Sequence, residues 1–459
     1  MQTRTDVTSG TALLAAIDAG QVVEIVAPDD PILWLAAAEV AAYSGRTDEA
    51  LEDIRRAGQM SPELARRARC IEAELAIERG DTATGEVSAL DVLTEGLATG
   101  DRGACVRARL AVVRAKVRDG RYRSALDDLP RLRREIDSDD TATDEQRVFR
   151  RAICDHLEAY SKLKLGDSSA ALAGAHRAIG EFVRLGAGRW EGFARNIVGL
   201  VLLDRGELDG ALREFERSEA CAAAGSDLVY MLISRNNAAI VTLAQGRLSD
   251  AIVALRSSIE METGTVADVT ALLLLAKAYG TMGRRTEARS CAKRAVEKSD
   301  ALGHEETGAD ARIVSAWLDG ATDRLRVLRD RAEARGTSML VRACLVYLAD
   351  LEPASRPDHA RALLDVADEG AGADEFVPLV ERIRARLDVA PIQIERDCLT
   401  IDLSRGVPHL DDVIEAVERT LLERAMRQGG GVQRRAAKIL GISPTRVLYL
   451  RRKLGKLST

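Results

Sequence analysis

A short pattern that recurs along the chain constrains its fold more strongly than any other feature. It is a glycine followed five positions later by an alanine, and in most copies then by an aliphatic residue. A degenerate copy, GDTATG, begins at Gly80, and with it successive glycines lie 35, 40, 46, 40, 40 and 37 residues apart. The full copies are GRTDEAL from Gly45, GRYRSAL from Gly120, GDSSAAL from Gly166, GELDGAL from Gly206, GRLSDAI from Gly246 and GRRTEAR from Gly283.

Each glycine of this pattern lies between two stretches with helical apolar periodicity. Around Gly206, one stretch covers residues 196–204 and the next covers residues 209–220. Glycine ends a helix in a tight turn without a Cβ penalty, and the small alanine lets the second helix pack closely on the first. One hairpin cannot bury its own apolar side, so the hairpins must stack into an α-solenoid. Aromatic residues make up only 3% of the chain, which also favours an all-α fold over a sheet.

The repeats resemble tetratricopeptide repeats in their longer variety, over about residues 32–300. The resemblance implies a solenoid whose concave surface binds a peptide or a partner protein. The first full copy matches the family's Trp, small, Ala, Ala and Pro positions with Trp34, Ala38, Ala50, Ala57 and Pro62.

The flanking segments set the limits of the solenoid at residues 32–388. Residues 301–388 keep a helical periodicity but fit the repeat poorly, and we interpret them as divergent closing repeats. Residues 1–31 are predicted to form one helix, from Thr11 to Ile17, and a loop. Residues 389–409 alternate apolar and polar residues around Arg396-Asp397, which predicts a short β-hairpin, with an extended linker as the alternative.

The end of the chain has a second pattern, which predicts two short helices joined by a tight turn. Gly441 supplies the left-handed residue of the turn, Ser443 is suited to cap the second helix and Pro444 to begin it. The apolar positions of the first helix, residues 433–440, are Ala436, Ala437, Ile439 and Leu440. Those of the second helix are Val447, Leu448, Leu450 and Leu454.

The spacing within this pattern is the one that a helix-turn-helix requires. Counting from Gln433, an Ala falls fifth, a Gly ninth, an Ile tenth, a Val fifteenth and a Leu eighteenth. The small residue lets the second helix cross the first closely, the glycine makes the turn, and the later apolar residues hold the second helix in place. The alternative is an ordinary helical hairpin at the end of a helical protein.

An amphipathic helix, residues 410–426, precedes the motif and is separated from it by three glycines. Helix and motif together match a known pattern at Glu418, Ala425, Gly431, Ala436, Ala437, Leu440, Gly441, Ile442, Leu454 and Gly455. The tail therefore resembles the Fis-type DNA-binding domain, which is also found in bacterial enhancer-binding activators. The resemblance implies a domain of residues 410–459 that binds double-stranded DNA as a homodimer through the 410–426 helix. Val432 departs from the usual Asn, which removes a capping contact, and Pro444 and Arg446 replace a common basic residue and a common Thr.

Charge is distributed unevenly and supports this interpretation. The chain has a formal net charge of −6, and residues 429–459 contribute +8 without an acidic residue, so that residues 1–428 carry −14. A basic end on an acidic body is typical of a regulator whose tail contacts a polyanion. We predict that Arg446 grips a guanine and that basic neighbours hold phosphates. The predicted DNA-binding residues are Gln433, Arg434, Arg435, Ser443, Thr445, Arg446, Tyr449, Arg452 and Lys453.

Two successive repeats carry matching polar residues 40 positions apart, Arg195-Asn196 and Arg235-Asn236-Asn237. In related repeat proteins such asparagines bond the backbone of a bound peptide, a task that suits an amide because it both donates and accepts. We therefore predict a peptide- or partner-binding role for Arg195, Asn196, Arg235, Asn236 and Asn237. The alternative is that these side chains bond neighbouring helices or water.

Enzymatic classes find little support in the sequence. There is no G-x-x-x-x-G-K-[ST] phosphate loop, and the five histidines show no metal-binding spacing, so we expect no enzyme activity, no cofactor and no metal. No stretch resembles a signal peptide or a membrane span, and seven scattered cysteines favour a reducing cytoplasm. The predicted function is a sequence-specific DNA-binding transcriptional regulator with a signal-receiving solenoid. The alternatives are a scaffold whose basic tail docks another protein, and a regulator whose acidic solenoid masks the tail.

Overall fold

The computed structural model describes residues 31–43, 47–57, 61–225, 227–352, 357–368, 373–388, 393–395, 398–400 and 410–454. The helix predicted from Thr11 to Ile17 lies outside these residues. The chain divides into two compact units, residues 1–275 with 372–374 and residues 276–371 with 375–459. In the described part of the chain, no helix is long and apolar enough to cross a membrane.

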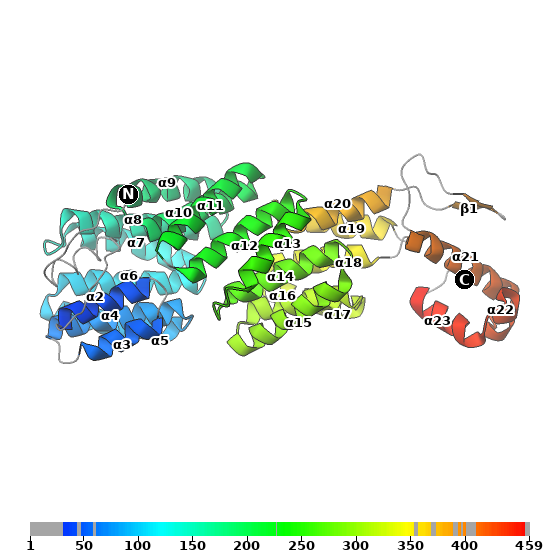
Figure 1. Cartoon of the computed structure of the whole chain (residues 1–459), viewed down its shortest axis with the longest axis horizontal. Coiled ribbons are helices and arrows are strands. Elements are labelled where there is room, and N and C mark those ends of the chain that lie inside the picture. The colour runs from blue at the N-terminus through cyan, green and yellow to red at the C-terminus, as the bar shows by residue number, and fades with distance from the viewer. Residues whose placement is uncertain are drawn as a thin grey trace. The chain divides into compact units, whose positions relative to one another are not determined.

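Helices make up the first unit, and consecutive helices pack side by side (Figure 1). Its helices are α2 (Pro31–Tyr43), α3 (Thr47–Arg56), α4 (Pro62–Glu78), α5 (Thr82–Thr99), α6 (Arg102–Arg118), α7 (Tyr122–Asp137), α8 (Asp144–Lys164), α9 (Ser168–Leu185), α10 (Gly188–Asp204), α11 (Leu208–Ala224), α12 (Leu228–Ala244) and α13 (Leu248–Ile259). The boundary between the units falls inside α14 (Val266–Thr281).

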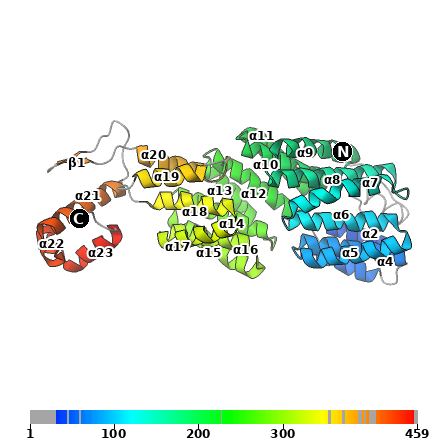
Figure 2. The same ribbon diagram turned by 180° about the vertical axis from the view of Figure 1, so that it is seen from behind.

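The second unit also consists mainly of consecutive helices, and α15 to α18 lie together in both views (Figures 1 and 2). Its elements after α14 are α15 (Arg285–Leu302), α16 (Glu305–Leu318), α17 (Thr322–Ala334), α18 (Ser338–Leu351), α19 (Pro357–Asp368), α20 (Val377–Asp388), β1 (Gln393–Glu395), β2 (Cys398–Thr400), α21 (Leu410–Gln428), α22 (Gln433–Leu440) and α23 (Pro444–Leu454). Over the residues that the structure describes, the fold is therefore all-α apart from one two-stranded sheet, as the sequence predicts.

The glycine–alanine pattern forms the joint of each helical hairpin. Gly206 and Gly246 have φ angles of +75° and +73°, the left-handed conformation in which a side chain is strained. The alanine five positions later lies fully buried in every full copy: Ala50, Ala125, Ala171, Ala211, Ala251 and Ala288 each have 0% exposure. In the degenerate copy a glycine, Gly85, takes the place of the alanine. A Cβ at Gly85 would come within 2.6 Å of the Ala73 carbonyl oxygen, so this hairpin packs too closely even for alanine.

The same joint continues beyond residue 300, where the sequence pattern was judged divergent. Gly320 has a φ of +69° between α16 and α17. Five residues later stands Leu325, which is fully buried. The larger leucine fills the position that alanine holds in earlier hairpins, so a search for glycine and alanine misses this copy.

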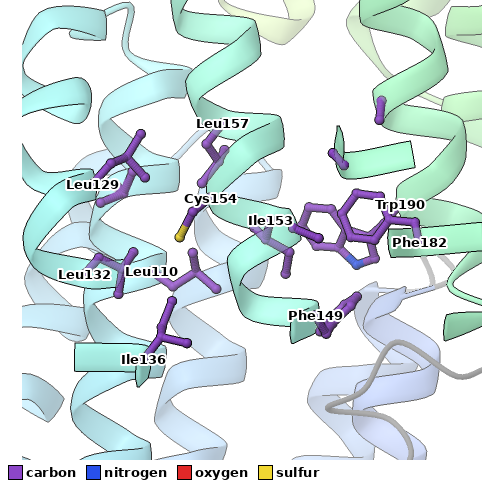
Figure 3. Packing of buried hydrophobic residues seen from close by; sticks show 14 of the residues in the cluster. Leu110, Leu129, Leu132, Ile136, Phe149, Ile153, Cys154, Leu157, Phe182 and Trp190 are labelled. Atoms are coloured by element: carbon purple, nitrogen blue, oxygen red, sulfur yellow. The ribbon is translucent and has the colours of Figure 1, made fainter. Parts of the chain in front are cut away.

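Aromatic side chains gather in the core where α8, α9 and α10 meet (Figure 3). The rings of Phe149 and Phe182 lie 5.9 Å apart, and those of Phe149 and Trp190 lie 6.0 Å apart. His156 lies edge-on to Trp190 at 5.9 Å, and burial lowers its pKa to about 4. Cys154 is buried in the same cluster, and burial raises its pKa to about 12.

A buried charge cluster ties together helices of the second unit. Lys277 of α14 donates to the carboxylates of Asp310, at 2.9 Å, and Glu375, at 3.1 Å. Burial acts to lower the pKa of Lys277, but the two carboxylates raise it well above its ordinary value. The lysine is therefore charged, and it neutralises acids that burial would otherwise destabilise.

The segment between the repeats and the tail contains the β-hairpin that the sequence alternation predicts. Strands β1 and β2 pair antiparallel with Gln393 opposite Thr400 and Glu395 opposite Cys398. Helix α21 then begins at residue 410 and ends at residue 428, close to the predicted 410–426.

Candidate nucleic-acid interface

Helices α21, α22 and α23 pack around a small apolar core of their own. Its buried side chains are Leu422 from α21, Ala437 from α22, and Val447, Leu450 and Leu454 from α23. Four of the five spaced positions of the predicted helix-turn-helix are thus core residues or turn residues, and the fifth, Ile442, packs against the same core. The sequence spacing and the three-dimensional packing agree.

The turn between α22 and α23 has the predicted construction. Gly441 ends α22 with a φ of +67°. The hydroxyl oxygen of Ser443 accepts a hydrogen bond from the Arg446 backbone N–H at 3.2 Å, which caps α23 in front of Pro444. Val432 begins α22 without a side-chain capping bond, as expected from the missing Asn. The turn therefore fixes the direction in which α23 leaves α22.

Helix α23 presents its polar side to solvent. Val447, Leu450 and Leu454 face the core, so the residues on the remaining side of the helix project outward. Of the predicted DNA-binding residues, Gln433 is half-buried, and the others are exposed: Arg434, Arg435, Ser443, Thr445, Arg446, Tyr449, Arg452 and Lys453. Two further exposed cations, Lys438 and Arg451, were not predicted for this surface.

Two of the apolar positions predicted for these helices lie outside the core. Ile439 is 48% exposed and Leu448 is 39% exposed. Each is next in sequence to a residue that packs against the core, and one residue turns about 100° around a helix. The apolar runs of these two helices are therefore wider than their buried faces.

Arg446 and Lys453 have defined neighbours on this surface. The Arg446 guanidinium lies over the Tyr449 ring at 4.8 Å from its centre. Lys453 Nζ donates to Glu418 Oε2 of α21 at 2.8 Å, and this hydrogen bond raises the pKa of Lys453. Arg446 Nη2 lies 3.7 Å from the other oxygen of Glu418. The pairing of Glu418 with α23 was not predicted, because 35 residues separate it from Lys453.

The polar residues predicted to bind a peptide in the solenoid make hydrogen bonds to neighbouring helices or within their own helix. Asn237 Nδ2 donates to Asn196 Oδ1 at 2.8 Å, which links α12 to α10. Asn236 is buried and donates to the Ala267 carbonyl oxygen at 2.9 Å. These bonds are the alternative that the sequence left open for the asparagines.

The two predicted arginines of this set are also engaged with carboxylates. Arg195 donates to Glu191 at 2.7 Å and to Glu214 at 2.9 Å. Arg235 donates to Glu219. A ligand at this surface would have to replace these partners.

A different part of the first unit forms a hollow that sequence reasoning missed. It is a small, partly open hollow with a cavity volume of about 90 Å³, and the first helices of successive hairpins line it. Its walls alternate charged and apolar groups, and the Arg114 guanidinium lies over the Trp190 ring at 5.6 Å. The lining residues that characterise it are Glu39, Glu78, Arg107, Arg114, Arg189 and Trp190. Charged residues at one-repeat spacing, such as Glu74 and Arg114, were the available signal.

Comparison with known families and solved structures found one family match and several structural matches. The family described as bacterial regulatory protein, Fis family, matches residues 413–457. A Rap protein complexed with Competence and Sporulation Factor is 12% identical, with a TM-score of 0.55 over 82% of this chain and 98% of that chain. The apo form of the quorum sensor NprR from B. thuringiensis is 13% identical, with a TM-score of 0.52 over 73% of this chain and 96% of that chain. The Rap conjugation gene regulator of the plasmid pLS20, in complex with the Phr* peptide, is 13% identical, with a TM-score of 0.52 over 84% and 99%.

No curated protein matches the chain. At these identities the solved structures are evidence for the fold alone, a stack of helical hairpins like that of the tetratricopeptide repeat. The chain is therefore a tetratricopeptide-like helical-repeat protein that ends in a Fis-type helix-turn-helix domain.

Proposed function

We propose that this chain is a sequence-specific DNA-binding transcriptional regulator whose helical repeats receive a peptide or protein signal. One observation carries the proposal: α22 and α23 expose a basic surface in a stretch, residues 429–454, that contains no acidic residue. Such a surface attracts the phosphate backbone, and a helix-turn-helix places its second helix in the major groove. A regulator of this kind would act in the cytoplasm, beside the chromosome.

The exposed residues divide naturally into two roles on duplex DNA. Thr445, Arg446 and Tyr449 lie on the leading part of α23, where base edges would be reached first. The planar fork of Arg446 is suited to the two acceptors of guanine. Arg434, near the start of α22, and Arg452, near the end of α23, are suited to phosphates and would fix the register of the domain.

The direct test is selection of DNA from a random duplex pool by the full-length chain. The proposal predicts that a common sequence is enriched, and that Arg446→Ala relaxes the preference at one or two positions. The matched control is Arg184→Ala, which removes an exposed arginine from α9 and should leave the enriched sequence unchanged. A pool that stays random after repeated selection would show that the chain does not read DNA sequence.

The outer face of α21 supports a homodimer. Ile414 is 44% exposed and Leu421 is 51% exposed, and the half-buried Val417 lies between them at helical spacing. A second copy of α21 would cover this apolar stripe and place two recognition helices on one DNA site. Leu421→Glu should convert a dimer into a monomer in light scattering. A wild-type chain that is monomeric at micromolar concentration would reject this assignment.

The hollow among α2, α4, α6, α8 and α10 is the proposed receiver of the signal. Its walls combine apolar surface with paired charges, a lining suited to a peptide that has both kinds of side chain. The similar Rap regulator of plasmid pLS20 was solved with the Phr* peptide. Screening of peptide pools against the chain should quench Trp190 fluorescence on binding, and Trp190→Phe should remove that change. Binding that leaves Trp190 unaffected would place the partner elsewhere.

A protein-docking role for the tail is the second candidate. Ile439 and Leu448 expose apolar surface on α22 and α23, which a protein partner could cover. If the full-length chain retains no DNA, this scaffold interpretation becomes the better one. If DNA is retained only after a peptide has bound the repeats, the acidic solenoid masks the tail.

A further inference from the structure

Glu418 is an acidic residue of α21 whose carboxylate is shared between two basic residues of α23. Its Oε2 accepts a hydrogen bond from Lys453 Nζ at 2.8 Å, and its Oε1 lies 3.7 Å from Arg446 Nη2. The two cations are separated by seven positions along α23, so the carboxylate spans almost two turns of that helix. One acidic group thus faces both the leading and the trailing part of the proposed DNA-binding surface.

Glu418, Arg446 and Lys453 are exposed enough for a group on DNA to replace the carboxylate as the partner of either cation. The Arg446 side chain is 54% exposed and that of Lys453 is 38% exposed, whereas Glu418 is 23% exposed. Pairs this close to solvent contribute little to folding, because water screens them. A phosphate or a base edge that approaches α23 can therefore take over either cation without unfolding the domain.

Glu415, the nearest other carboxylate of α21 on the N-terminal side, has a different hydrogen-bond partner. Glu415, one turn earlier, accepts from Arg419 of its own helix at 3.2 Å. The stretch that follows α21, residues 429–454, contains no acidic residue. Glu418 therefore bonds the basic surface directly, whereas Glu415 bonds its own helix and raises the pKa of Lys453 only through its charge, by less than Glu418 does.

Competition between the carboxylate and DNA has a predictable direction. Binding to phosphates of any sequence must first replace Glu418 at Lys453 and at Arg446, which weakens non-specific binding. At a matching sequence the same carboxylate has to be replaced, so specific binding is weakened by a similar factor. Both affinities are therefore lower than on a surface without the acid, and a sequence is bound well only where it offers further contacts, such as the two acceptors of a guanine for Arg446.

We propose that Glu418 is a positioning residue that restrains the DNA-binding surface: its carboxylate holds Arg446 and Lys453 until DNA replaces it, which lowers the affinity for every duplex. The inference rests on the proposed DNA-binding function and deepens it. Glu418 makes no contact with DNA in this account and acts through the two cations that it holds.

The experiment compares two isosteric variants of the full-length chain, Glu418→Gln and Glu415→Gln. Both remove one negative charge from α21, but only the first removes the partner of α23. Dissociation constants are measured for a random duplex and for the duplex enriched by the wild-type chain, each at several salt concentrations. Thermal unfolding of both variants is followed to establish that the domain remains folded.

Glu418→Gln should bind the random duplex about three- to tenfold more tightly than the wild type, the effect expected when one or two exposed ion pairs no longer compete. The enriched duplex should gain by a similar factor, because the same carboxylate has to be replaced there. Glu415→Gln should change each affinity less than twofold.

A second comparison separates competition from a structural role. In a Lys453→Gln background the Glu418→Gln substitution should have a smaller effect on random-duplex binding, because one of the restrained cations is already absent. An equal effect of the two carboxylate variants, or weaker random-duplex binding by Glu418→Gln, overturns the inference alone. A wild-type chain that binds no duplex at low salt overturns the proposed function and this inference together.

Discussion

Arginine has opposite surroundings in the repeats and in the C-terminal domain. In the first unit, Arg66 donates to Asp101 at 2.6 Å and Arg189 donates to Asp227 at 2.8 Å, and both guanidinium side chains are 9% exposed. In the C-terminal domain Arg446 is 54% exposed, and its carboxylate neighbour lies 3.7 Å away. The same residue type therefore joins helices in one region and remains available to a ligand in the other.

This difference shows that the number of basic residues is a poor guide to a polyanion site. The repeats contain most of the chain's Lys and Arg, yet they are acidic overall because carboxylates accompany them. The tail is basic because residues 429–459 contain no Asp or Glu. Substitutions of buried arginines in the repeats should therefore change stability, and those of exposed arginines in the tail should change DNA binding.

The largest effect is expected when a buried pair of the repeats is broken. Arg189→Ala would leave the carboxylate of Asp227, which is 3% exposed, without its guanidinium partner. A buried charge that loses its partner destabilises a protein by about 3–5 kcal/mol. Urea unfolding should show this loss, and the double variant Arg189→Ala/Asp227→Ala should recover part of it. A loss below about 1 kcal/mol would mean that this pair is as weak as a surface pair.

A smaller loss of stability is expected when the pH is lowered, again because of a residue in the repeats. Burial lowers the pKa of His156 to about 4 from an ordinary value of 6.5. Above pH 6.5 the imidazole is neutral in both states and has no effect. Between pH 6.5 and 4 only the unfolded chain takes up the proton, so the free energy of unfolding falls by roughly 2–3 kcal/mol.

The variant His156→Gln isolates this contribution from that of the carboxylates. Its free energy of unfolding should fall less than that of the wild type when the pH is lowered from 7 to 4.5, as followed by urea unfolding. Parallel pH profiles of the two proteins would show that His156 is not the group responsible.

Substitution of a basic residue of the tail should weaken DNA binding and leave stability unchanged. Arg452→Gln removes an exposed cation from α23. The slope of log K against log salt for duplex DNA should become shallower by about 0.9, while urea unfolding stays unchanged within about 0.5 kcal/mol. Fluorescence anisotropy with a labelled duplex measures the slope. An unchanged slope would exclude Arg452 from the phosphate contacts.

The smallest effect is expected from an exposed arginine of the repeats. Arg184 pairs with Glu181 at 2.9 Å, but the two side chains are 56% and 45% exposed. Arg184→Ala should therefore change stability by less than about 1 kcal/mol and leave DNA binding intact. It lies five positions before Arg189 in sequence, so the two variants compare an exposed and a buried arginine in the same region. A loss of stability as large as that of Arg189→Ala would show that burial does not explain the difference between the two arginines.

The hairpin joints were predictable from sequence because they depend on local chemistry. A glycine with positive φ and a fully buried alanine leave a clear signature at fixed spacing, and the same holds for Gly441 and Ser443 in the tail. Leu325 shows the limit of this approach. A change of residue type hides the position, although the fold around Gly320 is maintained.

The partners of polar side chains were less predictable because they lie far apart in the chain. Asn196 and Asn237 are separated by 41 residues and bond each other, and no spacing rule distinguishes that bond from a free amide. Glu418 and Lys453 present the same difficulty. Repeat spacing indicates which residues occupy equivalent positions, and only packing shows which of them meet.

The salt dependence of duplex binding by the full-length chain tests the central claim most directly. Four exposed cations, Arg434, Arg435, Arg452 and Lys453, are assigned to phosphates in each chain. The account predicts a linear fall of log K with log salt and a slope of about −3.6 per chain. Replacement of all four by Gln should bring the slope close to zero, with the unfolding free energy unchanged. Absence of duplex binding at the lowest salt, or an affinity that does not respond to salt, would contradict the account.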